Sequence, residues 1–189
     1  MQEKENVLRI LEETKQALKE DNAFKLKELS DQTIHTASIA QDSDNIAVAV
    51  IVYSLGKIIE RREYKKFEEW DNFYKTIISL IDSSIISLKR GYNKKLKENL
   101  ESIRISISNL SGNFKFYIQD VFRKAEINKA SKIYEHGISM EKTSKLLGIT
   151  MFELASYAGQ KQTFSQPSLG KTVNVNDRIK IVEDIFKWK

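Results

Sequence analysis

Residues that break helices are scarce in this chain, and this scarcity constrains its fold more than any other feature. Among 189 residues there are one proline and seven glycines. Proline lacks a backbone donor and glycine loses the most backbone entropy in a helix, so long stretches without either residue favour helix. Apolar residues recur three or four positions apart through these stretches, which places them on one helical face. We therefore predict an all-α protein whose 41% apolar content is enough to form a core.

The periodic pattern predicts six helices in succession, joined by short polar or glycine-containing turns. The first ends near Asp21, and the others span about 23–41, 45–62, 64–88, 92–110 and 114–136. The third is apolar enough to be a buried central helix. The β-branched end of the fourth could also form a strand, but its length and its lack of Gly and Pro favour helix. Short turns favour antiparallel neighbours, so we expect residues 1–123 to form an antiparallel helical bundle.

Residues 124–159 carry the pattern of a helix-turn-helix module. Gly137 ends the sixth helix, Ser139 caps a helix over 140–147, and Gly148 supplies the turn. Thr150 then caps a helix over 151–158, with Glu153 in the position that completes a capping box. The residues expected on the inner side are Ser144, Leu146, Leu147, Ile149, Leu154 and Tyr157. The alternative is an ordinary helical hairpin, because glycine between amphipathic helices is common in helical proteins.

The outward positions of the second module helix are Met151, Phe152, Ala155 and Ser156. None of them is an Arg, Lys, Asn or Gln that could form hydrogen bonds to base edges, so phosphate contacts should dominate any binding to DNA. The residues that we expect to contact DNA are Lys142, Lys145, Thr150, Met151, Phe152, Ser156, Gln160 and Lys161. Alternatively, Met151 and Phe152 are buried against a partner or against the bundle.

Positive charge is concentrated in the last third of the chain. From Lys124 onward there are 11 basic and 7 acidic residues, whereas residues 1–123 have 20 basic and 19 acidic ones. A basic excess beside a helix-turn-helix favours binding to a phosphate backbone, although an excess of this size is equally consistent with ordinary surface charge. Residues 160–189 begin as a polar stretch with Pro167 and Gly170, and a last amphipathic helix is expected over 177–188.

The module resembles the helix-turn-helix of small prokaryotic, especially archaeal, antitoxin-like regulators. The resemblance extends from about residue 125 to residue 159. The residues that carry it are Tyr134, Gly137, Ile138, Ser139, Leu147, Gly148, Ile149, Phe152, Glu153, Leu154, Tyr157 and Gly159. It implies that the module binds the operator DNA of its own operon and that a following segment, here 172–180, engages a toxin, often a PIN-domain ribonuclease.

No pattern in the sequence predicts a catalytic or metal site. Cysteine is absent, and the two histidines are His35 and His136. Asp31 precedes His35 by one helical turn, which predicts a surface salt bridge rather than a metal site, and His136 is expected at a helix C-terminus. Neither histidine has an arginine at the spacing of the HEPN-type ribonucleases. With no glycine-rich phosphate loop and no nucleophile elbow either, we expect no enzyme activity and no cofactor.

The aromatic stripe Phe67, Trp70, Phe73 and Tyr74 could stack on single-stranded nucleic acid, but its helical spacing favours a place in the core.

These observations together predict a DNA-binding regulator, antitoxin-like and homodimeric, whose partner is double-stranded DNA. The alternative is a non-enzymatic interaction module whose helix-turn-helix and residues 160–189 bind a partner protein such as a nuclease toxin. The N-terminus does not read as a signal peptide, and the longest apolar run, Ile46 to Ile59, is shorter than the roughly 20 residues that span a bilayer. We therefore expect a cytoplasmic protein with no membrane association, which the absence of cysteine also fits.

Overall fold

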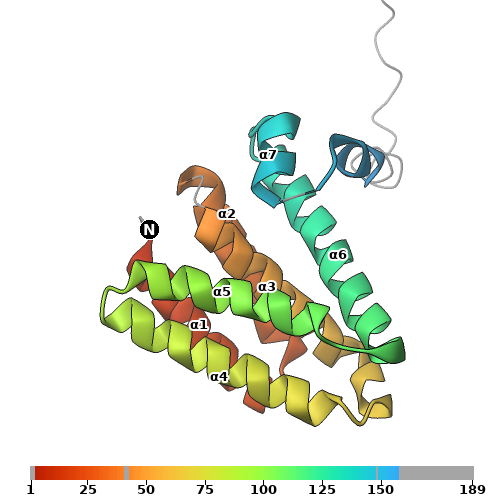
Figure 1. Ribbon diagram of the computed structural model, residues 1–189. Coiled ribbons are helices and arrows are strands. Elements are labelled where there is room, and N and C mark those ends of the chain that lie inside the picture. The colour runs from red at the N-terminus through yellow and green to blue at the C-terminus, as the bar shows by residue number, and fades with distance from the viewer. Residues whose placement is uncertain (1–2, 41–42, 148, 158–189) are drawn as a thin grey trace, which may run out of the picture. The chain divides into compact units, whose positions relative to one another are not determined.

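A computed structural model describes residues 3–40, 43–147 and 149–157, and within these ranges every regular element is a helix (Figure 1). The prediction of an all-α fold is confirmed. The helices are α1 (Lys4–Lys19), α2 (Ala23–Ala40), α3 (Ser43–Arg61), the 3₁₀-helix η1 (Glu63–Lys66), α4 (Trp70–Lys89), α5 (Asn93–Ser108), α6 (Gly112–Glu135), α7 (Met140–Leu147) and a short helix over 151–157. The predicted loop and helix of residues 160–189 lie outside the described residues. None of the described helices has both the length and the apolar character needed to cross a bilayer.

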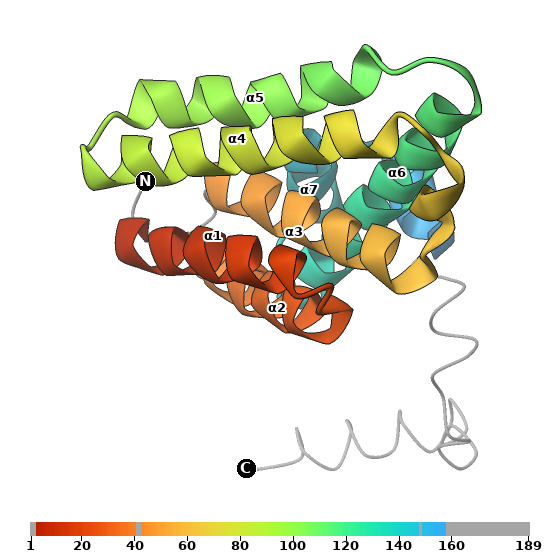
Figure 2. The same ribbon diagram turned by 90° about the horizontal axis from the view of Figure 1, so that it is seen from below.

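The α3 helix is buried at the centre of the bundle, as its sequence predicts. Figure 2 shows it between the α1–α2 hairpin and the α4–α5 hairpin. Its side chains Val48, Val52, Leu55 and Ile58 are each at most 1% exposed. At Gly56 the backbone lies so close to α2 that an added Cβ would be 3.0 Å from Cβ of Leu26, and Leu26 would have to shift by a few tenths of an ångström to accommodate it.

The predicted helix over 64–88 begins six residues later than expected, at Trp70. Arg62 adopts a left-handed conformation with φ of 56°, and Phe67 is extended. The break places the ring of Tyr64 4.3 Å from that of Trp70 and the ring of Phe67 5.2 Å from that of Phe114 on α6. Tertiary packing of aromatic rings therefore overrides helix propensity here. The same contacts confirm that the aromatic stripe belongs to the core.

A second apolar cluster joins the end of α6, α7 and the 151–157 helix to the α2–α3 hairpin. Its buried members are Ile34, Ile46, Ala49, Val50, Ala125, Ala130, Ile133, Ile138, Leu147, Ile149 and Leu154. The first cluster contains the core of the bundle and the beginning of α6. The predicted boundary between residues 123 and 124 thus lies within one continuous helix that takes part in both clusters.

A lysine is buried where α6 packs on α2. The side chain of Lys129 is 0% exposed, and its Nζ lies 2.8 Å from Oδ1 of Asp31 and 4.1 Å from the ring centroid of Tyr53. Burial lowers the pKa of Lys129 to about 8, against the opposite effect of Asp31. Burial also acts to raise the pKa of Asp31, but hydrogen bonds from Lys129 and Lys132 hold it below its usual value. The expected salt bridge from Asp31 to His35 is therefore wrong, because this carboxylate contacts two lysines of α6.

Replacing Lys129 should change how stability depends on pH. Between pH 8 and the ordinary lysine value of 10.5, the unfolded chain holds the Lys129 proton and the folded protein has lost it, so this residue's contribution to stability rises with pH. We expect wild type to gain about 2 kcal/mol relative to Lys129→Met between pH 8 and 9.5 in urea unfolding. A Lys75→Met control on the exposed surface of α4 should change in parallel with wild type. A constant difference between wild type and Lys129→Met would contradict the lowered pKa of the buried Lys129.

Candidate nucleic-acid interface

The candidate interface lies on the three-helix segment formed by the second half of α6, α7 and the 151–157 helix. Gly137, with φ of 86°, closes α6, and His136 occupies the C-terminal capping position as expected. The hydroxyl of Ser139 accepts a hydrogen bond from the backbone N–H of Lys142 at 3.3 Å, and α7 begins at Met140. Both the cap and the bounds of α7 are those predicted, because they depend on residues close together in sequence.

The predicted capping box at the start of the 151–157 helix is confirmed. The Thr150 hydroxyl accepts a hydrogen bond from Glu153 N–H at 3.1 Å, and Oε2 of Glu153 accepts one from Thr150 N–H at 2.9 Å. Ile149, 7% exposed, fills the corner before it. Gly148, predicted to make the turn, and the side chain of Leu146 lie outside the described residues.

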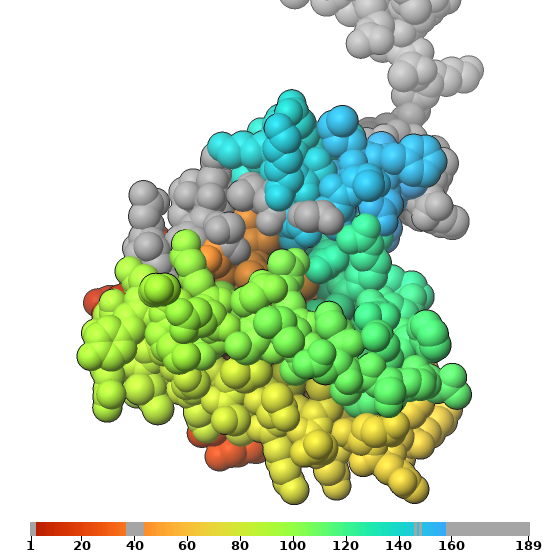
Figure 3. All heavy atoms as spheres, viewed as in Figure 1, coloured from red at the N-terminus to blue at the C-terminus, as the bar shows by residue number. Residues whose placement is uncertain are grey.

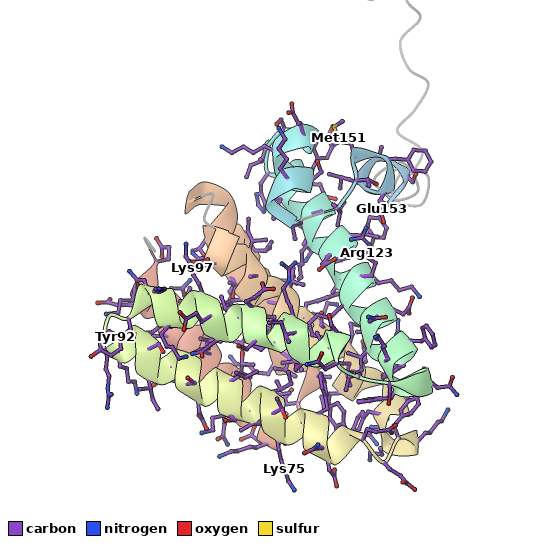
Figure 4. All side chains as sticks on the ribbon, in the orientation of Figure 1. Lys75, Tyr92, Lys97, Arg123, Met151 and Glu153 are labelled. Carbon is purple, nitrogen blue, oxygen red and sulfur yellow. The ribbon has the colours of Figure 1, made fainter. Side chains whose placement is uncertain are left out.

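Two polar contacts and one buried leucine fix the 151–157 helix to α6. Leu154 is 0% exposed and lies in the second apolar cluster. Nε of Arg123 donates to Oε1 of Glu153 at 3.1 Å, and Nδ2 of Asn128 donates to the Tyr157 hydroxyl at 2.9 Å. Figure 4 shows Arg123 below Glu153 along the same side of the segment. The backbone N–H and hydroxyl of Thr150, followed by Arg123, lower the pKa of Glu153 to about 2, so the carboxylate is charged in all but strong acid.

The outward face of this helix is apolar and exposed, as the sequence predicts. Met151 is 52% exposed and Phe152 is 80% exposed, and Ala155 and Ser156 are exposed beside them. Met151 lies at the far end of the segment from the bundle (Figure 4). The alternative in which Met151 and Phe152 are buried against the bundle is therefore wrong.

Of the eight residues predicted to contact DNA, six lie in the described part of the chain, and all six are exposed. They are Lys142, Lys145, Thr150, Met151, Phe152 and Ser156. Lys145 forms an exposed i,i+4 ion pair of 2.7 Å with Glu141 on α7, and the Thr150 hydroxyl is engaged in the capping box. Gln160 and Lys161 lie outside the described residues.

Sequence reasoning missed the contacts that join the three-helix segment to the rest of the protein. The rings of His35 on α2 and His136 at the end of α6 lie 5.4 Å apart in an edge-on arrangement. Arg123 lies at the end of the range predicted for the bundle, yet its side chain contacts Glu153 of the second module helix. No local spacing signals either pair, because the partners are far apart in sequence.

Comparisons of this chain with models of protein families, with curated proteins and with solved structures find no match. Over the described ranges, no three His, Asp or Glu side chains form a group that could hold a metal ion. What the site offers is an exposed apolar helix face with two lysines on the helix before it.

Removing the capping box should loosen the 151–157 helix. We expect Thr150→Ala to lower the free energy of unfolding by about 1 kcal/mol, as the loss of other N-caps does. Because the folded pKa of Glu153 is depressed from 4.5 to about 2, its contribution is present above pH 4.5 and is lost as the pH falls towards 2. The difference in Tm between wild type and Glu153→Gln should accordingly be larger at pH 7 than at pH 2.5. A Glu68→Gln control at an exposed position should give similar differences at both pH values.

Proposed function

We propose that this protein is a cytoplasmic DNA-binding regulator of the helix-turn-helix type, which binds double-stranded DNA as a homodimer. The observation that carries the proposal is the 151–157 helix, whose outer face is exposed while its inner face and its first turn are fixed to the rest of the protein. A recognition helix needs this combination, because it must enter the major groove without changing its orientation. Figure 3 shows α7 and the 151–157 helix at one end of the described unit.

The charges beside this helix favour contacts to phosphate. Lys142 and Lys145 are exposed on α7, which directly precedes the helix. The side chains of the Lys145–Glu141 ion pair are 75% and 66% exposed, and such surface pairs contribute little, so a phosphate can replace the glutamate. The apolar side chains of Met151 and Phe152 are suited to contacts with thymine methyl groups rather than to hydrogen bonds with bases. We therefore expect DNA binding that is strongly salt-dependent and only modestly sequence-specific.

The resemblance of residues 125–159 to antitoxin-like regulators suggests which DNA to test. Regulators of that kind bind the operator of their own operon, so the promoter of this protein's gene is the natural target. Two copies of the segment would contact half-sites one helical turn apart, which is the reason for proposing a homodimer.

Neutralising the two lysines of α7 should reduce the salt dependence of DNA binding. We expect fluorescence anisotropy at about 50 and 200 mM salt to show that Lys142→Gln/Lys145→Gln makes the log–log slope less negative by about 2 for each protomer bound. A control with the same loss of charge, Lys75→Gln/Lys94→Gln on α4 and α5, should keep the wild-type slope. Phe152→Ala should keep the slope but reduce the preference for the promoter over a scrambled duplex. Absence of DNA binding by the wild-type protein at both salt concentrations would overturn the proposal.

One observation favours a second candidate function, the binding of a partner protein. Phe152 is 80% exposed, and the outward face of its helix has no side chain that is charged or carries an amide. Exposed aromatic residues of this kind often anchor protein interfaces. In this alternative, the face of Met151 and Phe152 and residues 160–189 bind a protein such as a nuclease toxin.

The two candidates differ in how they respond to the same substitutions. If the face binds a protein, Phe152→Ala should weaken a co-purifying complex by about tenfold or more, as expected for an interface hot spot. The lysine variant Lys142→Gln/Lys145→Gln should leave that complex largely intact. A complex that survives both Phe152→Ala and deletion of residues 160–189 would exclude this candidate.

A further inference from the structure

A pocket between α3, α6 and the 151–157 helix is lined by side chains that have no role in either proposed function. Its volume is about 330 Å³, which lies within the range of small-molecule sites. One wall is a stripe of α3 residues spaced four apart, Tyr53, Lys57 and Arg61, and the facing wall on α6 carries Lys124 and Asn128. Tyr157 of the 151–157 helix closes one side.

The charges that line this pocket all have one sign. Lys57, Arg61 and Lys124 line it, and no carboxylate does. Lys57 pairs with Glu60 and Lys124 with Asp120, but neither of these acids lines the pocket. In the described part of the chain, Arg61 forms no hydrogen bond or ion pair through its side chain. A small anion entering the pocket would therefore meet cations without having to displace an acid from its lining.

The rest of the lining is suited to an apolar body with a polar substituent. Val121 and Ala125 are buried on the α6 side, and the half-buried ring of Tyr53 lies on the α3 side. One nitrogen of the Asn128 amide donates to Tyr157, whereas its Oδ1 is buried with no hydrogen-bond partner among the described residues. A buried acceptor without a partner is unfavourable, and a ligand donor could satisfy it.

A larger cavity of about 620 Å³ between α3, α5, α6 and α7 is a weaker candidate. The charges at its rim pair with one another, as in Lys97 with Asp44 at 3.7 Å and Arg104 with Glu126 at 3.4 Å. Three acids and three bases line it, so its charge selects no class of ligand.

We propose that the pocket between α3, α6 and the 151–157 helix binds a small organic anion, with an apolar body and one carboxylate or phosphate group. The anionic group contacts Arg61 and the two lysines, and the apolar body lies against Tyr53 and the α6 wall. Because Tyr157 closes the pocket, the bound anion stabilises the 151–157 helix on α6. The proposal concerns ligand binding alone and does not depend on DNA binding.

Anilinonaphthalene sulfonate, a fluorescent apolar anion, is a suitable probe for the full-length protein. We expect saturable binding at neutral pH, with a Kd at least tenfold lower than that of the uncharged analogue phenylnaphthylamine. Arg61→Gln/Lys124→Gln should raise the Kd of the sulfonate tenfold or more. The same variant should change neither the Tm of the protein nor the Kd of the uncharged analogue. The matched control Lys75→Gln/Lys94→Gln removes the same charge from α4 and α5 and should bind like wild type. The proposal would be overturned if both double variants bound the sulfonate equally more weakly than wild type. It would also be overturned if the sulfonate showed no saturable binding to wild type.

Two further measurements identify the anionic group and place the probe. Displacement of the probe by benzoate indicates a carboxylate ligand, and displacement by phenyl phosphate indicates a phosphate ligand. Displacement by neither compound contradicts the proposed chemistry. Bound probe should also slow amide hydrogen exchange in residues 151–157, and exchange that is unchanged there would show that the probe binds elsewhere.

Discussion

The continuity of α6 is the constraint on which the other helices depend. Residues 114–122 of this helix belong to the core of the bundle, and residues 125–133 belong to the second apolar cluster. An α-helix of 24 residues is a stiff element about 36 Å long, so the two clusters cannot reorient independently. The direction of the 151–157 helix is therefore set by the same packing that holds the bundle together. The bundle and the three-helix segment form one compact unit over the described part of residues 1–157.

A buried ion pair favours the register in which α6 packs on α2. A buried ion pair such as Lys129 with Asp31 contributes little net stability, because taking both charges out of water offsets most of their attraction. Any other register, however, would leave a buried lysine without its carboxylate, which is strongly unfavourable. Arg123, whose side chain is 41% exposed, contacts Glu126 on its own helix and Glu153 on the 151–157 helix. The Lys129–Asp31 pair thus favours the observed packing of α6 on α2.

The proposed interface is held in place by contacts to α6 and presents apolar side chains beside lysines. Its outward side chains offer shape and apolar surface, and its charge comes from lysines of the preceding helix. Such a face is suited to apolar and charge contacts that depend on where the helix is placed, rather than to specific hydrogen bonds, whether the partner is DNA or protein. The cation-lined pocket lies on another side of the same helix, at Tyr157. A ligand in this pocket would contact the inner side of the 151–157 helix, and contacts on that side fix the orientation of the helix on α6.

The sequence alone determined the helical class, the bounds of α7, and the caps at Ser139 and Thr150, which the structure bears out. These features follow from residues three or four positions apart, whose contacts are fixed once the chain is helical. Tertiary structure alone decided where the helix predicted from residue 64 breaks, that Asp31 pairs with Lys129 rather than His35, and that two stripes of α3 and α6 enclose a pocket lined with cations. Each of these depends on residues distant in sequence that meet only when the helices pack, and no local spacing encodes which helix faces will meet.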